Sequence, residues 1–214
     1  MNKKEKFVVT INREVGSGGR TVGEKLAAKL GVPFYDKALI KALQKKYNLT
    51  VAEIERLKGA KNNWWSDFSN MLSLGDTVKY YKVEEGQEPE VLTTEDLFQA
   101  EQEILQGIAN NGSCVIAGRS GFYVFRKHPN HLSVLIHASQ EARVQRIMRK
   151  NNVSEKEAEK IIETVDTMRE NYVNRYTGMS RYNTKMYDLV ISMDGLSEDD
   201  AASLIFDYIQ KTSK

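Results

Sequence analysis

The sequence has 214 residues, with 31 Lys and Arg against 29 Asp and Glu, a formal net charge of +2 and 41% hydrophobic residues. These proportions are typical of a folded globular protein and exclude an intrinsically disordered chain. The near balance of charge gives no reason to expect a nucleic-acid partner. The apolar runs are strand-sized and none resembles a secretory signal, so we expect a cytoplasmic protein without membrane association.

The first part of the chain alternates short apolar runs with helical patterns. A β-branched run is typical of a buried strand, and apolar residues four apart are typical of a helix. The pattern predicts a strand over 7–11, a helix over 21–30, a strand over 32–35 and a helix over 37–47.

Residues 48–94 interrupt this alternation, because aromatic residues here stand among polar and glycine residues. We interpret the segment as an inserted, mostly helical lobe with a hairpin near Gly86. The pair Trp64-Trp65 could stack on a nucleobase, although such a pair more often packs a small lobe onto its neighbour.

The alternation of strands and helices then resumes. It predicts a helix over 94–108, strands over 114–117 and 132–136, helices over 139–150 and 154–176, a strand over 188–193 and a helix over 197–211. Ser154 and Glu157 have the spacing of a capping box. The fold prediction is a single α/β domain over 1–214 with a five-stranded parallel sheet flanked by helices. A short lid is expected at about 149–156.

The segment between the first strand and the first helix has the composition of a phosphate-binding loop. Its residues are Gly16, Ser17, Gly18, Gly19, Arg20 and Thr21. Glycines let the backbone curl around phosphate oxygens, and the helix N-terminus favours an anion. Against the pattern G-x-x-x-x-G-K-[ST], Gly19 and Thr21 match, whereas Glu14 and Arg20 replace the first glycine and the lysine. A guanidinium still pairs with phosphate as a planar fork, so we expect phosphate binding. A dinucleotide fingerprint fits less well, because its third glycine is missing.

Five motifs stand at or near the ends of the predicted elements. They are Arg13-Glu14-x-Gly16-Ser17-Gly18-Gly19-Arg20-Thr21, Tyr35-Asp36, Gly118-Arg119, Asp166-x-x-Arg169-x-x-Tyr172 and Tyr187-Asp188-Leu189-Val190-Ile191. Together they resemble the cytidylate kinase-like proteins, a branch of the P-loop nucleoside monophosphate kinases. The resemblance covers almost the whole chain except 48–94. It implies a P-loop kinase-like fold with core, lid and monophosphate lobe, and transfer of the ATP γ-phosphate to CMP or dCMP with Mg²⁺.

The same resemblance implies roles for individual residues. The segment from Gly16 to Thr21 would bind the ATP phosphates, with Arg20 as a catalytic cation and Thr21 as the ligand of Mg²⁺. The expected acceptor-binding residues are Arg13, Asp36, Arg119, Asp166 and Arg169. Arg13 and Glu14 could also pair with each other.

Three further arginines, Arg143, Arg146 and Arg149, recur at three-residue spacing on one predicted helix. Because that helix leads into the lid of this fold, we expect Arg146 and Arg149 to act as catalytic cations near the phosphates. The alternative is a solvated helix face paired with Glu141 or Glu155. For Asp166 and Arg169, the alternative is an exposed helix with salt bridges along its surface.

The histidines and the single cysteine do not point to chemistry. His128, His131 and His137 are separated by a turn and a strand, which does not match a metal site. Cys114 lies in an apolar strand and is expected to be a packed core thiol.

Three functions remain open at this point. The first is phosphoryl transfer to CMP or dCMP. The second is a P-loop kinase for another small metabolite, recognised by the insert. The third is a nucleotide-binding regulatory protein without kinase turnover, for which the departures Arg20, Ser120 and Ile162 from the family pattern argue.

Overall fold

The computed structural model describes residues 1–36 and 94–213. The chain divides into one compact unit of Met1–Asp36 and Gly112–Lys214 and a second of Lys37–Asn111. From the second unit the structure describes helix α5 (Thr94–Asn111), which was predicted over 94–108. The helix expected over 37–47 and the inserted lobe expected at about 48–94 lie outside the described residues.

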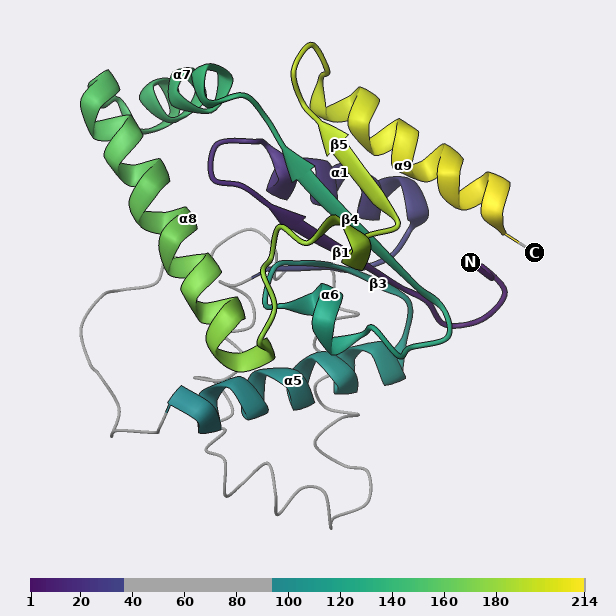
Figure 1. Ribbon diagram of the computed structural model, residues 1–214. Coiled ribbons are helices and arrows are strands. Elements are labelled where there is room, and N and C mark those ends of the chain that lie inside the picture. The colour runs from purple at the N-terminus through teal and green to yellow at the C-terminus, as the bar shows by residue number, and fades with distance from the viewer. Residues whose placement is uncertain (37–93, 214) are drawn as a thin grey trace. The chain divides into compact units, whose positions relative to one another are not determined.

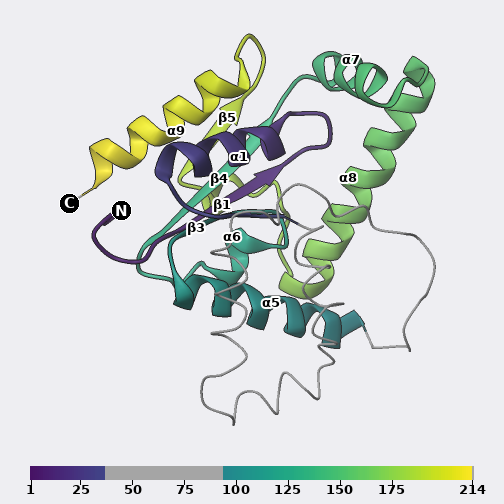
Figure 2. The same ribbon diagram turned by 180° about the vertical axis from the view of Figure 1, so that it is seen from behind.

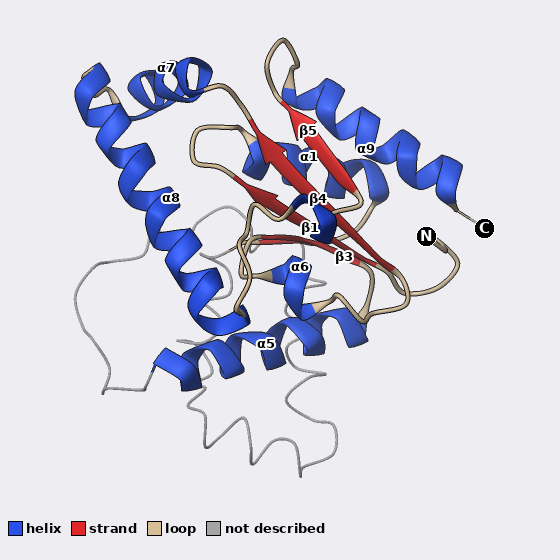
Figure 3. Ribbon diagram, viewed as in Figure 1, coloured by secondary structure: helices blue, strands red, loops and turns tan. Residues whose placement is uncertain are grey.

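The first unit is built on one parallel sheet (Figures 1 and 3). Its strands are β1 (Val8–Arg13), β2 (Phe34–Tyr35), β3 (Cys114–Ala117), β4 (His131–His137) and β5 (Leu189–Ser192). They lie in the order β2-β3-β1-β4-β5, and every pairing is parallel. β1 is central, with Val8 opposite Cys114 on one side and His131 on the other. The predicted five-stranded parallel sheet is therefore confirmed.

The helices of this unit also follow the predicted order. They are α1 (Gly19–Leu30), α6 (Gly121–Val124), α7 (Gln140–Asn151), α8 (Glu155–Thr177) and α9 (Glu198–Thr212), with a 3-10 turn η1 (Thr184–Met186). α6 and η1 were not predicted, because neither is long enough to show a helical repeat. Only residues 152–154 link α7 to α8, where the short lid is expected. None of the described helices has the length and apolar composition needed to span a bilayer.

One face of the sheet carries the main apolar core. α1 and α9 lie side by side on this face (Figure 2). The buried residues that pack together here include Val9, Ile11, Val22, Leu26, Val134, Ile136, Ala201, Ile205 and Ile209. Burial of this apolar surface fixes the strands, and because they are parallel, their carboxyl ends meet at one edge of the sheet. That edge is where α7 and α8 lie and where the candidate site is found (Figure 1).

Three helices begin with a serine cap. Ser139, Ser154 and Ser197 each accept a hydrogen bond from a backbone N–H in the first turn of α7, α8 and α9. The capping box predicted from Ser154 and Glu157 is confirmed. These caps satisfy N–H groups that a helix otherwise leaves without a partner. α1 begins differently.

Candidate active site

The loop between β1 and α1 takes a shape that requires glycine. Gly16 and Gly18 have φ of +81° and +84°, in the left-handed region that other residues avoid. A Cβ on Gly16 would lie 2.8 Å from the carbonyl oxygen of Arg143, and one on Gly18 would lie 3.0 Å from the guanidinium of Arg146. The glycines therefore permit both the turn of the backbone and the close approach of α7.

The N-terminus of α1 has no side-chain cap. Gly18 is its N-cap residue, and the first turn contains no acidic residue. The Thr21 hydroxyl forms no hydrogen bond with any residue in the described part of the chain. Ser17 is buried, and its hydroxyl donates to the Glu14 carbonyl at 3.0 Å, within the loop. The first-turn N–H groups of α1 are thus available to an anion that the helix dipole also favours.

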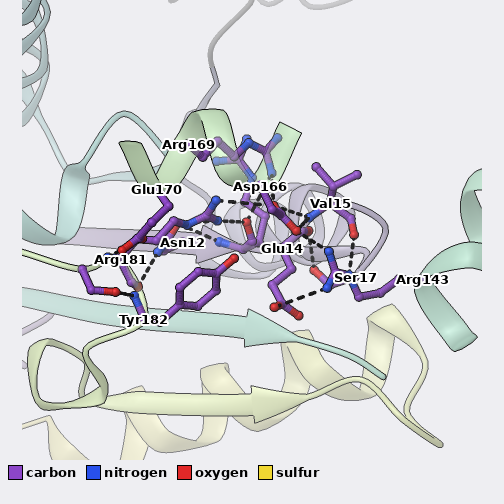
Figure 4. Close-up of polar contacts among 12 residues, drawn as sticks. Asn12, Glu14, Val15, Ser17, Arg143, Asp166, Arg169, Glu170, Arg181 and Tyr182 are labelled. Carbon is purple, nitrogen blue, oxygen red and sulfur yellow. Dashed lines mark hydrogen bonds and ion pairs between the residues drawn. The ribbon is translucent and has the colours of Figure 1, made fainter. Parts of the chain in front are cut away.

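Asp166 of α8 holds the loop from the other side (Figure 4). Its two carboxylate oxygens accept the Val15 N–H at 3.1 and 3.3 Å. Arg143 pairs with the same carboxylate and donates through Nε to the Val15 carbonyl at 2.8 Å. Asp166 and Arg143 are only 9% and 8% exposed. Both backbone groups of Val15 are therefore fixed by one buried ion pair.

Glu14 is tied to the same arginine. One of its carboxylate oxygens lies 3.4 Å from Nη1 of Arg143, and the other accepts the Ala138 N–H at 3.3 Å. The sequence allowed a pair between Glu14 and Arg13, but in the structure Glu14 pairs with Arg143. The carboxylate that replaces the first glycine of the phosphate-loop pattern thus contacts α7 and the residue that follows β4.

Arg181 completes this network and was missed by the sequence analysis. Its side chain is 1% exposed and pairs with Asp166 at 3.4 Å. It also donates to the carbonyl of Arg13 and, at 3.3 Å, to Oδ1 of Asn12. The surrounding segment has no periodic pattern, so nothing in the sequence distinguishes Arg181 from an exposed arginine.

Arg13, the last residue of β1, lies in a different environment from Arg143 and Arg181, which pair with carboxylates. Burial first, and then the nearby charges of Arg169 and Arg181, lower the pKa of Arg13 to about 9. Its guanidinium lies against Gly118, where a Cβ would collide with it. Within residues 1–36 and 94–213, Arg13 forms no ion pair. The charge of Asp36 opposes this lowering, and Arg13 remains charged at neutral pH.

Arg20 is turned toward the end of β2. Its Nε donates to Asp36 at 2.7 Å, and its Nη1 lies 2.8 Å from Glu24. Burial lowers the pKa of Arg20, but the hydrogen bonds and charges of Asp36 and Glu24 outweigh this and raise it. The side chain is 54% exposed. Arg20, which was expected to bind the ATP phosphates, is therefore paired with Asp36, which was expected to bind the acceptor nucleotide.

The other expected arginines divide between the site and the surface. Arg146 lies over Gly18 and pairs with Glu198 at the start of α9, and this hydrogen bond lowers the pKa of Glu198. Arg169 lies 3.6 Å from Asp166 and 3.4 Å from the Arg13 carbonyl. Arg149 is exposed and donates to Gln145 of its own helix at 3.2 Å, and it forms no ion pair with a described residue. The structure thus brings Arg146 and Arg169, but not Arg149, to the loop.

Arg119 follows β3, in a turn of unusual backbone geometry. Gly118, Arg119 and Ser120 all have positive φ, between +53° and +83°. Because β3 is the neighbour of both β1 and β2, this turn lies at the same edge of the sheet as Arg13 and Asp36.

An open cavity of about 600 Å³ lies along α8 and the start of α7. Its lining includes Glu159, Glu163, Asp166 and Glu170, with Arg143 as the single cation. This excess of carboxylates disfavours a phosphate group. Phosphate binding is therefore expected at the N-terminus of α1, and not in this cavity.

Comparison with known proteins places the chain among kinases. A family model described as the cytidylate kinase-like family matches residues 8–195. The chain is 26% identical to a cytidylate kinase of Pyrobaculum neutrophilum, over 96% of this chain and 94% of the relative. It is 23% identical to a cytidylate kinase of Sulfolobus acidocaldarius, over 95% of this chain and 94% of that protein.

Two solved structures share its fold. An uncharacterised protein from Eubacterium ventriosum has a TM-score of 0.70 and 23% identity, covering 95% of this chain and 98% of that one. A shikimate kinase from Bacteroides thetaiotaomicron has a TM-score of 0.51 and 14% identity, covering 95% and 98%. At these identities the likeness concerns the fold alone.

Proposed function

The chain belongs to the cytidylate kinase-like family, and we propose that it transfers the γ-phosphate of ATP to a nucleoside monophosphate, with CMP or dCMP as the acceptor. Family and fold together support a phosphotransferase of the P-loop class. The observation that carries the proposal is the glycine loop of Gly16–Gly19, which leads into an uncapped helix N-terminus.

On the donor side, the loop and the first turn of α1 would bind the ATP phosphates. Gly16, Gly18 and Gly19 would supply backbone N–H groups, and Ser17 shapes the loop through its bond to Glu14. The Thr21 hydroxyl fits a Mg²⁺ ligand, because none of the described residues engages it and Mg²⁺ in such sites is held by few protein groups plus phosphate oxygens. When bound, Mg²⁺ neutralises charge on the phosphates.

On the acceptor side, the proposal rests on the strand order. Arg13 is the last residue of β1, and Asp36 and Arg119 come just after β2 and β3, so all three lie at the ends of neighbouring strands. Arg169 reaches the same place from α8 through the Arg13 carbonyl. Arg13, Arg119 and Arg169 would bind the acceptor phosphate, while Asp36 would contact the nucleotide. No general base is needed if the attacking phosphate oxygen is already ionised.

Catalysis would come mainly from positioning and positive charge, as in other phosphoryl transfers. Arg146 lies over Gly18 and is the best placed of the three arginines on α7. Arg20 would stabilise the transferred group once its pairing with Asp36 is exchanged for phosphate. Arg149 would contribute only through movement of the lid.

The pairing of Arg20 with Asp36 also supports a second candidate function. A guanidinium held by two carboxylates at the lysine position fits a protein that binds nucleotide without turnover. A regulatory protein of this kind would use the same loop to bind ATP but would not transfer its phosphate.

A coupled ADP-release assay with Mg·ATP and a panel of nucleoside monophosphates tests the proposal, with ATP binding measured in parallel by calorimetry. We expect turnover with CMP or dCMP and its loss, by about 100-fold or more, in Arg20→Ala and Arg146→Ala. ATP binding without turnover on any acceptor would favour the regulatory protein. Turnover only with a small metabolite outside the nucleotides would assign another acceptor, and no ATP binding would contradict the phosphate loop itself.

A further inference from the structure

We propose that Asp166 is a positioning residue that sets the shape of the phosphate loop, acting with Arg143, and that it does not contact the acceptor nucleotide. The inference rests on the proposed function for its kinetic test. It departs from the acceptor role that the family resemblance implies for this position.

The first argument is that the protein already uses both oxygens of the Asp166 carboxylate. Oδ1 accepts from Val15 and lies 3.4 Å from Arg181, while Oδ2 accepts from Val15 and from Arg143. The carboxylate is 9% exposed. A sugar hydroxyl of an acceptor would have to displace one of these charge-assisted hydrogen bonds, which are the stronger kind in proteins.

The second argument is that the partners of Asp166 belong to the loop. Val15 donates its N–H to Asp166 and its carbonyl accepts from Arg143, so the ion pair clamps one peptide unit on each side of Val15. The next residue, Gly16, lies directly against the backbone of Arg143. A change in this ion pair is therefore transmitted to the glycines whose N–H groups we propose bind the ATP phosphates.

The third argument concerns what the network spans. Asp166 lies on α8, Arg143 lies on α7 and Arg181 lies in the segment after α8, and all three converge on residues 12–15. Buried groups that join several elements in this way determine one local arrangement, and removing one partner leaves the others buried without compensation. The loop shape is thus set by the two helices that flank the lid.

The kinetic test compares Asp166→Asn with Glu163→Gln, a matched neutralisation of an exposed carboxylate one turn earlier on α8. Asparagine offers one acceptor oxygen to donors that now use two. We expect KM for ATP and the Kd for ATP to rise about tenfold or more in Asp166→Asn. Because Arg169 pairs with Asp166 at 3.6 Å, KM for CMP also rises, but by less than KM for ATP, and its ratio to KM for dCMP stays within about twofold of that in the unmodified protein. The reverse split, with KM for CMP raised and ATP binding unchanged, would overturn the proposal.

A second measurement needs no nucleotide. Amide hydrogen exchange, followed residue by residue by NMR, reports the Val15 N–H directly. We expect its exchange to quicken about tenfold or more in Asp166→Asn and to stay unchanged in Glu163→Gln, whereas amides in β1 stay protected in both. Equal exchange at Val15 in all three proteins would overturn the inference, even if the unmodified protein neither bound ATP nor turned over.

Should Asp166→Asn fail to fold, Arg143→Lys carries the same tests. Lysine keeps the charge beside Asp166 but cannot donate at the same time from Nε to the Val15 carbonyl. We expect the same rise in KM for ATP and faster exchange at Val15. An unchanged KM for ATP in this variant would count against the positioning role.

Discussion

The two sides of the glycine loop are stabilised in opposite ways. On the side of α7 and α8, the carboxylates of Glu14 and Asp166 meet the guanidiniums of Arg143 and Arg181 in a buried network. Among the described residues that we expect to bind the acceptor at the ends of β1 to β3, Arg13 and Arg119 accompany one carboxylate, Asp36. Matched charges in the interior shape the backbone, whereas an excess of one sign attracts a ligand of the opposite sign. The first side therefore builds the loop, and the second is where we propose that the acceptor phosphate binds.

Arg143→Ala breaks the matched side and should have the largest effect. It leaves two carboxylates without their shared cation in a buried position, which costs about 3–5 kcal/mol. For a chain of this length, the melting temperature should fall by about 10 °C. Thermal unfolding followed by circular dichroism measures the change. Arg149→Ala, on the same helix but exposed, is the stability control and should shift the free energy of unfolding by less than about 0.5 kcal/mol.

Gly16→Ala tests how closely α7 approaches the loop. The substitution places a Cβ 2.8 Å from the Arg143 carbonyl oxygen and also strains a left-handed residue. We expect a loss of about 2–4 kcal/mol from strain and displacement together. Gly31→Ala shares the positive φ but meets no atom within 4 Å, so it should cost only about 1 kcal/mol. Equal costs at the two positions, measured by urea denaturation, would contradict the close approach.

The pH dependence of stability tests a buried group of the sheet, His131, that is not part of the glycine loop. Burial is the main cause that lowers the pKa of His131, at the start of β4, to about 4, while Asp188 raises it and His128 lowers it further. Because the unfolded chain takes up the proton near pH 6.5 and the folded one only near pH 4, stability falls as the pH drops through that window. The loss should reach about 3 kcal/mol by pH 4.

His131→Gln is the control for this titration. It retains a polar group beside the Thr10 hydroxyl, which lies 2.7 Å from Nε2 of His131, and removes the titrating group. The pH dependence of unfolding between 6.5 and 4 should flatten in this variant. An unchanged slope would assign the acid sensitivity to another group.

The sequence predicted the described strands and the longer helices because each has a local signal, whereas α6 and η1 are too short to have one. The apolar alternation located the strands, and the capping-box spacing of Ser154 and Glu157 marked where α8 begins. The network could not be predicted in the same way. Arg181 has no local pattern, and Asp166 and Arg143 are 23 residues apart, so their pairing depends on how α7 and α8 pack. Arg20 and Asp36 were both singled out, but the sequence did not indicate that they would pair with each other.

Arg13→Gln tests the strand-end side of the loop and should have the smallest effect on the free energy of unfolding. Arg143 is matched by carboxylates, but Arg13 is a cation in a largely buried place with Arg169 and Arg181 nearby. Removing its charge relieves repulsion, so the free energy of unfolding should change by less than about 1 kcal/mol or rise. The cost should appear on the acceptor instead, as a rise in KM for CMP of about tenfold with KM for ATP unchanged. Melting temperatures with and without CMP check this independently, since a bound ligand stabilises only the protein that binds it. A loss of stability as large as that of Arg143→Ala would show that the two sides of the loop are built alike.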